Sequence, residues 1–266
     1  MTSEPRIVLC MKWGTKYGPE YVNRLYGMVR RHLSGEFLFV CLTDDASGVR
    51  SEVQCLPLPT LDLAPGADRG WPKLTTFKSD LHGLRGQALF LDLDIVVVGS
   101  LDAFFEMPGE FLIIHDWKRP WRVTGNSSVY RFRIGAHADV LQRFVDHQAA
   151  VRKRYRNEQE YLSHALHEQG KLAYWPKGWC CSFKYHCLPR WPLNHWRTAR
   201  IPQDARIVVF HGEINPPDAI RGGRTARGRF LRWETETTPP IAAPADSPVR
   251  RFTVWSPSRI VAHFRD

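Results

Sequence analysis

Short apolar runs and amphipathic stretches alternate through the first hundred residues. Apolar runs of strand length lie at 6–11, 37–42 and 53–58. Apolar residues recur at helical spacing over 19–33 and again over 74–86, where a glycine closes the pattern. The alternation predicts a mainly parallel α/β sheet with helices on both faces.

The next apolar run, ALFLDLDIVVVGSLD at 88–102, contains two carboxylates. Side chains two apart on a strand point the same way, so Asp92 and Asp94 share one side while Leu93 turns into the core. Two like charges this close repel each other unless a cation meets them. Carboxylate oxygens suit Mn²⁺ or Mg²⁺, ions that keep positions open for phosphate oxygens. The pair therefore predicts a metal site.

Polar loops follow the first, second and fourth of these runs, and they define a candidate binding site. In parallel α/β sheets, ligands lie beyond the carboxyl ends of the strands. The sequences KWGTKYG, TDD and DLD all fall there. The candidates in the first two loops for holding a base and ribose are Lys12, Trp13, Thr15, Tyr17 and Asp44. A surface loop and a turn-forming acidic pair are the alternative interpretations.

The remaining chain is less regular. Strands are predicted at 110–117, 128–132 and 205–212, and helices at 135–149 and 157–169. Four tryptophans at 175, 179, 191 and 196 surround a cysteine-rich stretch. Aromatic rings stack on sugar faces, so an acceptor platform is one interpretation and a packed aromatic core is the other.

Composition points to an anionic partner. The 266 residues carry a formal charge of +10, with 37 Lys and Arg against 27 Asp and Glu. A nucleotide, a phosphorylated substrate, an acidic membrane surface or nucleic acid would each fit this charge. The chain shows neither a secretory leader pattern nor a long apolar span. We therefore expect a cytoplasmic protein with reduced cysteines, which at most contacts the inner face of a membrane peripherally.

Four further motifs, in order, carry a family resemblance. WPKLTTF precedes FLDLD, and GNSSVYRF, NEQEYLS and VVFHGEINPP follow it. Together they resemble the GT-A nucleotide-sugar glycosyltransferases, closest to the retaining family 8 type that includes glycogenin and bacterial lipopolysaccharide glycosyltransferases. The resemblance covers residues 6–217. It implies a twisted sheet flanked by helices, with a Rossmann-like nucleotide-binding half.

The resemblance also implies roles for individual residues. Asp92, Asp94 and His211 would hold Mn²⁺ or Mg²⁺. Gln159, together with the adjacent Glu158, would lie beside the anomeric carbon of the donor sugar, and Gln159 would stabilise the positive charge that develops there. The residues that would contact the donor are Lys12, Trp13, Thr15, Tyr17, Asp44, Lys73, Asp92, Leu93, Asp94, Asn126 and Ser127.

Two positions depart from the family pattern. Val209 stands where the family has its metal-binding histidine, and His211 follows two residues later on the same strand face. Asn215 stands where the family has a lysine for the diphosphate, so Lys12, Lys16 or an arginine from 221–232 would have to supply that charge.

We therefore expect a metal-dependent, retaining glycosyltransferase that moves a sugar from a nucleoside diphosphate sugar to a glycan or glycolipid hydroxyl. A sugar-1-phosphate nucleotidyltransferase is the enzymatic alternative. A basic nucleic-acid-binding protein is the alternative without catalysis, and the paired acids argue against nucleic acid as a partner. Residues 1–234 would form the catalytic domain, 235–248 a linker, and 249–266 a docking segment for peripheral membrane contact.

Overall fold

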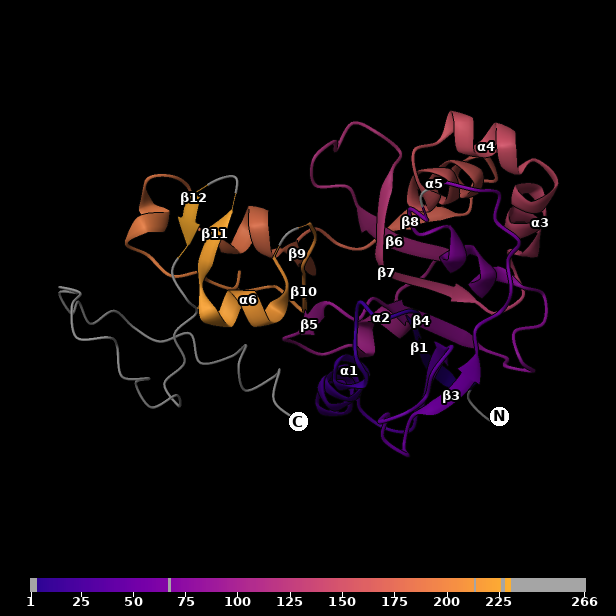
Figure 1. The fold of residues 1–266 in the computed structure, drawn as a ribbon, viewed down its shortest axis with the longest axis horizontal. Coiled ribbons are helices and arrows are strands. Elements are labelled where there is room, and N and C mark those ends of the chain that lie inside the picture. The colour runs from indigo at the N-terminus through magenta and orange to yellow at the C-terminus, as the bar shows by residue number, and fades with distance from the viewer. Residues whose placement is uncertain (1–3, 67, 213, 226–227, 231–266) are drawn as a thin grey trace.

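A seven-stranded mixed sheet forms the centre of the molecule (Figure 1). The computed structural model describes residues 4–66, 68–212, 214–225 and 228–230. In spatial order the strands are β3 (Gln54–Pro57), β2 (Leu38–Thr43), β1 (Arg6–Lys12), β4 (Gln87–Leu91), β7 (Gly125–Arg133), β6 (Phe111–His115) and β8 (Leu172–Tyr174). The first four run parallel, and β7 is antiparallel to both of its neighbours. The predicted mainly parallel α/β sheet is confirmed.

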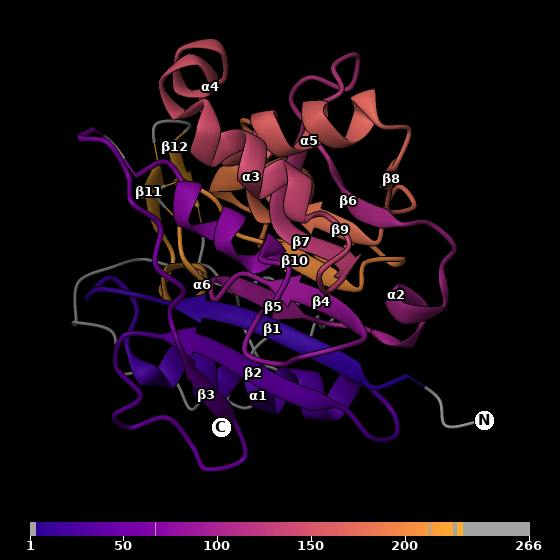
Figure 2. The same cartoon turned by 90° about the vertical axis from the view of Figure 1, so that its right-hand side faces the viewer.

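Helices cover both faces of this sheet, as Figure 2 shows. On one face lies α1 (Pro19–His32), packed against Val8 and Cys10 of β1. The other face is covered by the 3₁₀ helix η1 (Trp71–Phe77), α3 (Ala138–Asp146), α4 (Gln148–Arg154) and α5 (Glu158–Glu168). Ile7 and Leu9 of β1 point to that second core. Alternate residues of one strand thus build two apolar cores.

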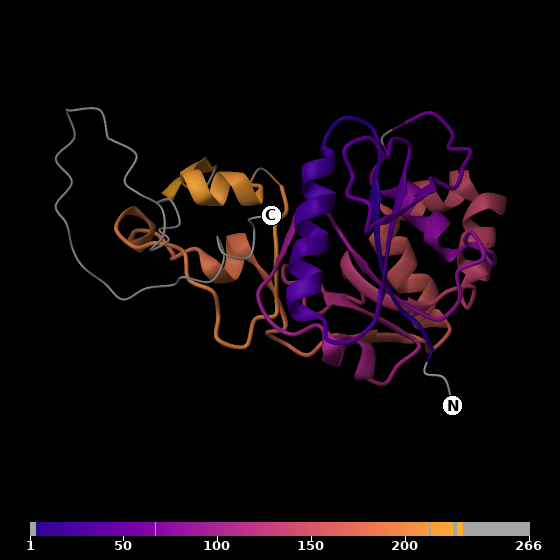
Figure 3. The same ribbon diagram turned by 90° about the horizontal axis from the view of Figure 1, so that it is seen from below.

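A smaller part of the chain follows on the α1 side, away from α3–α5 (Figures 1 and 3). Its three-stranded sheet contains β5 (Ile95–Val97), β10 (Ile207–Val209) and β9 (Cys180–Ser182). The other elements of this part are the π-helix η2 (Phe183–Cys187), the 3₁₀ turn η3 (Leu193–His195), α6 (Pro216–Arg221) and a hairpin of β11 (Gly223–Thr225) and β12 (Gly228–Phe230). The short helix α2 (Asp102–Glu106) packs against β4 of the main sheet. Ile95 of β5 pairs with Val209 of β10, so the two sheets are joined directly after β4.

The predicted helix over 74–86 is wrong. After η1 the chain turns at His82 and Gly83, whose φ angles of 53° and 73° lie in the left-handed region. The Asp80 carboxylate accepts a hydrogen bond from the Gly83 amide at 2.8 Å, which stabilises this turn. Leu81 and Leu84 are nevertheless buried. The periodicity thus correctly indicated burial but not the backbone conformation.

Several boundaries also differ from the sequence pattern. The predicted helix at 135–149 divides into α3 and α4 at His147, and the strand expected at 205–212 is limited to β10. Among the described helices, none combines the length and apolar character needed to cross a bilayer. The predicted linker at 235–248 and docking segment at 249–266 lie outside the described residues.

Candidate functional site

The candidate site lies at one end of the strands of the main sheet, where β1, β2 and β4 finish and the antiparallel β7 begins. An edge of the sheet here means one of the two ends of its strands. Lys12 closes β1 beside Thr43 of β2. Leu91 closes β4 opposite Val129 of β7, and the Asp92 amide donates a hydrogen bond to a β7 carbonyl at 2.9 Å. The strand topology thus brings four separate segments of the chain to this edge.

Lys73 and Asp92 form an ion pair at this edge. The Lys73 Nζ lies 2.6 Å from Asp92 Oδ1, and the two side chains are 13% and 21% exposed. The same ammonium lies 5.4 Å from the Phe90 ring centroid. Burial opposes the charge on Lys73, but the carboxylates of Asp92 and Glu158 outweigh it and raise the lysine's pKa. Lys73 is therefore a cation held among carboxylates.

Asp94 is the second carboxylate, and it lies in a turn between β4 and β5 rather than inside one continuous strand. Leu93 is 4% exposed and points into the core, as predicted. The Tyr17 hydroxyl donates a hydrogen bond to Asp94 Oδ2 at 2.7 Å. Burial and the neighbouring Asp92 raise the pKa of Asp94 to about 6. The charge of Asp92 thus acts on Asp94 in the sense inferred from the sequence.

Glu158 and Gln159 begin α5 and reach the same neighbourhood through Ser127. Glu158 is 5% exposed, and its carboxylate accepts a hydrogen bond from the Ser127 hydroxyl. The Ser127 amide donates to Gln159 Oε1 at 3.3 Å. Burial raises the pKa of Glu158, while Lys73 and the Ser127 hydroxyl act in the opposite sense. Glu158 is therefore held inside the site rather than presented on its surface.

Gly70 was not among the residues singled out from the sequence, although the site depends on it. The φ of Gly70, 80°, lies in the left-handed region. Gly70 is the N-cap of η1, the helix that carries Lys73. A Cβ at this position would lie 2.5 Å from Glu158 Oε2. A glycine is needed here for both reasons. The only sequence signal was a glycine directly before Trp71-Pro72.

The predicted nucleotide loop lies at the ends of β1 and β2. The Lys12 ammonium is almost fully buried and donates to the Asp45 carbonyl at 2.9 Å. The Asp44 carboxylate accepts from the Gly14 amide at 2.8 Å, which ties the two loops together. Thr15 is exposed at the tip. Lys12 thus supports the loop, whereas Thr15 is open to a ligand.

Two further predicted donor residues make local contacts. The Trp13 indole N–H donates to Asp68 at 3.3 Å. The Asn126 side-chain Oδ1 accepts from the Ser128 amide at 3.1 Å, which shapes the start of β7. Both side chains are partly exposed.

His211 follows β10, and its ring contacts other groups than the two aspartates. Its Nε2 lies 2.7 Å from the Ser182 hydroxyl, and the ring stacks on Trp117 at 5.7 Å. Among the described residues there is no group of three or more His, Cys, Asp and Glu side chains that could hold a metal. Because β5 and β10 are antiparallel, however, Asp94 before β5 and His211 after β10 leave the same end of this strand pair.

The chemistry of the donor set fits a hard divalent cation. Asp92 and Asp94 would supply oxygen ligands, and the pKa of Asp94 is raised first by burial and then by the charge of Asp92. A dication between them would remove that repulsion. Two protein carboxylates, completed by phosphate oxygens, are a typical ligand set for Mg²⁺.

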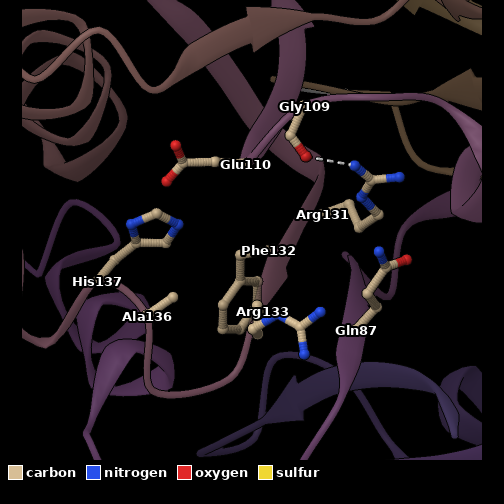
Figure 4. A pocket seen from close by; sticks show the side chains of 8 residues that line it. All are labelled: Gln87, Gly109, Glu110, Arg131, Phe132, Arg133, Ala136 and His137. Carbon is tan, nitrogen blue, oxygen red and sulfur yellow. Dashed lines mark hydrogen bonds between the residues drawn. The ribbon is translucent and has the colours of Figure 1, made fainter. Parts of the chain in front are cut away.

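Two clefts of about 230 and 280 Å³ lie at the opposite edge of the sheet. Figure 4 shows the first, which is lined by Gln87, Gly109, Glu110, Arg131, Phe132, Arg133, Ala136 and His137. Arg133 pairs with Glu4 at 2.5 Å, and in the second cleft Arg6 pairs with Asp102 at 3.2 Å. The charges of these clefts are therefore largely paired within the protein.

Comparison with known proteins identifies the fold. No protein-family model and no curated protein matches the sequence. Solved structures do match: the galactosyltransferase LgtC in complex with donor and acceptor sugar analogues has a TM-score of 0.52 at 11% identity, covering 79% of this chain and 88% of LgtC. The glycosyltransferase GlyE of Streptococcus pneumoniae TIGR4 has a TM-score of 0.55 at 13% identity, covering 79% of this chain and 56% of GlyE.

The bifunctional glycosyltransferase WbbM matches with a TM-score of 0.51 at 10% identity, covering 81% of this chain and 47% of WbbM. At these identities the likeness concerns the fold. The GT-A-like α/β fold inferred from the motifs is confirmed, and this chain is similar in fold to glycosyltransferases that include LgtC.

Proposed function

We propose that the protein is a glycosyltransferase that moves a sugar from a nucleoside diphosphate sugar to an acceptor hydroxyl. The observation that carries the proposal is the cluster of Lys73, Asp92 and Asp94 at the carboxyl ends of parallel strands. Sheets of this class bind their ligands at that edge. A fold shared with glycosyltransferases adds independent support.

Asp92 and Asp94 would hold Mn²⁺ or Mg²⁺, with His211 as a third ligand once its ring leaves the Ser182 hydroxyl. Such an ion acts as a Lewis acid on the departing diphosphate. The shared end of β5 and β10 supports the inclusion of His211.

Lys73 and Lys16 are the cations best placed to contact the phosphate groups. Lys73 lies among the carboxylates, and Lys16 is close enough to Asp94 to lower its pKa. Asn215, at the position of the family lysine, caps α6 in a reciprocal arrangement with Asp218. That side chain has a structural role, so charge for the diphosphate would come from the lysines.

Gln159 is our candidate for the group that stabilises positive charge at the sugar carbon. An active-site mutant of LgtC has a glutamine replaced by glutamate, which supports a glutamine in this role. Glu158, buried on Ser127, would orient Ser127 and the start of α5 for sugar binding. In a retaining reaction the acceptor hydroxyl attacks from the leaving-group side, and its proton passes to the departing phosphate oxygen.

The nucleotidyltransferase alternative predicts a different product. Such an enzyme releases pyrophosphate from a nucleoside triphosphate, and it would normally carry a glycine-rich basic first loop. The loop here, KWGTKYG, has two glycines. A nucleic-acid-binding role fits the net charge of +10 but places paired acids at the site, where phosphates would be repelled.

The experiment is a panel of nucleotide sugars incubated with the protein and Mn²⁺, followed by detection of released nucleoside diphosphate. We expect one donor to be hydrolysed or transferred, with the activity lost on chelation. The glycan or glycolipid acceptor would then be sought with that donor, and NMR of the product would report a retained anomeric configuration. Release of pyrophosphate from nucleoside triphosphate and sugar phosphate, with every nucleotide sugar inert, would contradict the proposal.

We further propose that transfer takes place in the cytoplasm. The predicted contact of residues 249–266 with a membrane remains a prediction, because that segment lies outside the described residues.

A further inference from the structure

The four tryptophans that surround the cysteine-rich stretch separate into two kinds. Trp175 is 5% exposed, and Trp179 is partly buried and stacks with it at 6.3 Å. Trp191 and Trp196 are 76% and 73% exposed. The first pair belongs to the core, so the core interpretation is confirmed for it. The second pair lies outside the core, and exposed aromatic side chains gathered on one short loop are candidates for a binding surface.

The loop that carries the exposed pair, residues 190–200, is ordered by its own backbone. The Arg197 amide donates to the Leu193 carbonyl at 2.8 Å, and the Arg200 amide donates to a carbonyl of η2 at 2.9 Å. Asn194 and Ala199 point inward and are 7% and 1% exposed. Leu193 is 44% exposed. The loop is thus fixed by backbone hydrogen bonds and exposes Trp191, Trp196 and Leu193 to solvent.

The stretch of sequence that contains the 190–200 loop carries charge of one sign. Between Glu168 and Asp204 the sequence contains no acidic residue, while it contains Lys171, Lys177, Lys184, Arg190, Arg197 and Arg200. The three arginines of the loop are exposed. The neighbouring strand β12, which forms a hairpin with β11, packs beside η3. Figure 1 shows this hairpin at the end of the molecule opposite α3 and α4.

We propose that the 190–200 loop docks the protein onto an anionic lipid bilayer. Tryptophan and leucine would enter the boundary between headgroups and acyl chains, and the arginines would bind the anionic headgroups. A sugar platform is the less favoured occupant, since sugar hydroxyls are usually also bound by carboxylate or amide groups, and this loop contains no carboxylate. The proposal does not depend on the transfer reaction.

Vesicle flotation without any sugar donor tests the proposal. The protein should float with vesicles of equal parts phosphatidylglycerol and phosphatidylcholine, and not with phosphatidylcholine alone. Combined Trp191→Ser and Trp196→Ser should lower the partition coefficient by about tenfold or more. Arg190→Gln, Arg197→Gln and Arg200→Gln should each lower it about fivefold. Because all five side chains are exposed, melting curves should match the wild type.

The matched control is Trp121→Ser. Trp121 is 77% exposed and flanked by Arg122, but it lies on the loop between β6 and β7. An equal loss of binding from this variant would overturn the assignment to the 190–200 loop. So would unchanged flotation of the double tryptophan variant, or a defect of that variant confined to binding of soluble glycans. Brominated acyl chains should quench the wild-type tryptophan fluorescence more than that of the double variant; equal quenching would also overturn the proposal.

Discussion

At the Arg131 edge, the end of the main sheet where β7 finishes, Arg131 is 2% exposed. Its guanidinium donates to the carbonyls of Phe104, Phe105, Met107 and Gly109 at 2.6–3.2 Å. At the carboxylate edge, the end of the sheet that holds Asp92 and Asp94, the half-buried Asp94 lies beside Asp92, and its pKa is raised to about 6. These carbonyls belong to α2 and to the residues directly after it, where backbone acceptors lack helical partners. That charge is neutralised by fixed groups of the fold. Tyr17, Lys73 and Lys16 act on Asp94 in the opposite sense, yet its pKa stays raised.

The difference teaches how to separate structural charges from functional ones in this molecule. The clefts at the Arg131 edge contain charged groups, but Arg6 and Arg133 form ion pairs within the chain. The carboxylate edge retains electrostatic repulsion, which stabilises nothing in the folded protein. Repulsion that a protein keeps at the ligand-binding edge of its sheet is typical of an active site.

The largest effect should come from Asp94→Asn. We expect transfer to fall by at least about 1,000-fold, since a proposed ligand of the cation that acts on the leaving diphosphate is removed. The free energy of unfolding should rise by about 1–2 kcal/mol at neutral pH, because a carboxylate with a raised pKa no longer has to ionise. Initial rates and melting curves measure the two effects. Glu110→Gln at the opposite edge is the control and should change neither; a transfer rate near wild type in Asp94→Asn would refute the role.

Arg131→Met should show the reverse behaviour. It leaves several buried carbonyls without a donor, so the free energy of unfolding should fall by about 3 kcal/mol or more. Donor kinetics of the folded fraction should stay as in the wild type. Denaturant titration measures the first effect, and rates normalised to folded protein measure the second. Arg133→Gln, which removes an exposed arginine, is the control and should leave the free energy of unfolding nearly unchanged. A selective loss of donor affinity in Arg131→Met would contradict the purely structural role of Arg131.

Gln159→Ala should have a smaller effect on catalysis. If its amide stabilises charge that develops only in the transition state, kcat should fall about 10–100-fold while KM for the donor changes little. Steady-state kinetics on the best donor of the panel provides the measurement, with Gln142→Ala on α3 as a control. A change confined to KM would reduce Gln159 to a group that binds substrate.

The smallest effect concerns His137 at the Arg131 edge. Its ring is 1% exposed, packs edge-on against Phe77 and Phe111, and has no hydrogen-bond partner at either nitrogen. Burial lowers its pKa below the ordinary value of 6.5. The folded state thus disfavours the protonated ring, so stability is fully present above pH 6.5 and is lost as pH falls through the lowered pKa.

His137→Phe should remove this dependence and stabilise the protein by about 1 kcal/mol, because two unsatisfied polar atoms disappear. Melting temperatures of both proteins between neutral and mildly acidic pH give the comparison. Parallel curves would show that other groups govern the acid sensitivity.

The sequence predicted those features of the site that depend on local pattern. The interruption of an apolar run located Asp92 and Asp94, and motif order located Lys73 and Gln159. The partner of Asp94 could not be predicted, because Tyr17 is 77 positions away and reaches it only through the pairing of β1 with β4. The need for glycine at residue 70 depends on the buried Glu158 of α5, which no local pattern reveals.

Secondary structure failed where spacing and backbone geometry diverged. Leu74, Phe77, Leu81 and Leu84 are all buried, as a helix face would be, but the chain turns at Asp80–Gly83. Hydrophobic spacing reports which residues face a core, and a left-handed turn can satisfy the same spacing. The exposed tryptophans were ambiguous for a related reason, since composition does not distinguish a core ring from a surface ring.

The central claim is that the carboxylate edge binds the diphosphate of a nucleotide sugar. Calorimetric titration with the nucleoside diphosphate of the active donor, with and without Mn²⁺, tests it most directly. Binding should require Mn²⁺ in the wild type, and Lys73→Met should weaken it about 10–100-fold, the value of a charge-assisted contact. Lys78→Met, at the end of the same helix η1, should bind normally. Equal affinity with and without Mn²⁺, unchanged in Lys73→Met, would contradict the account.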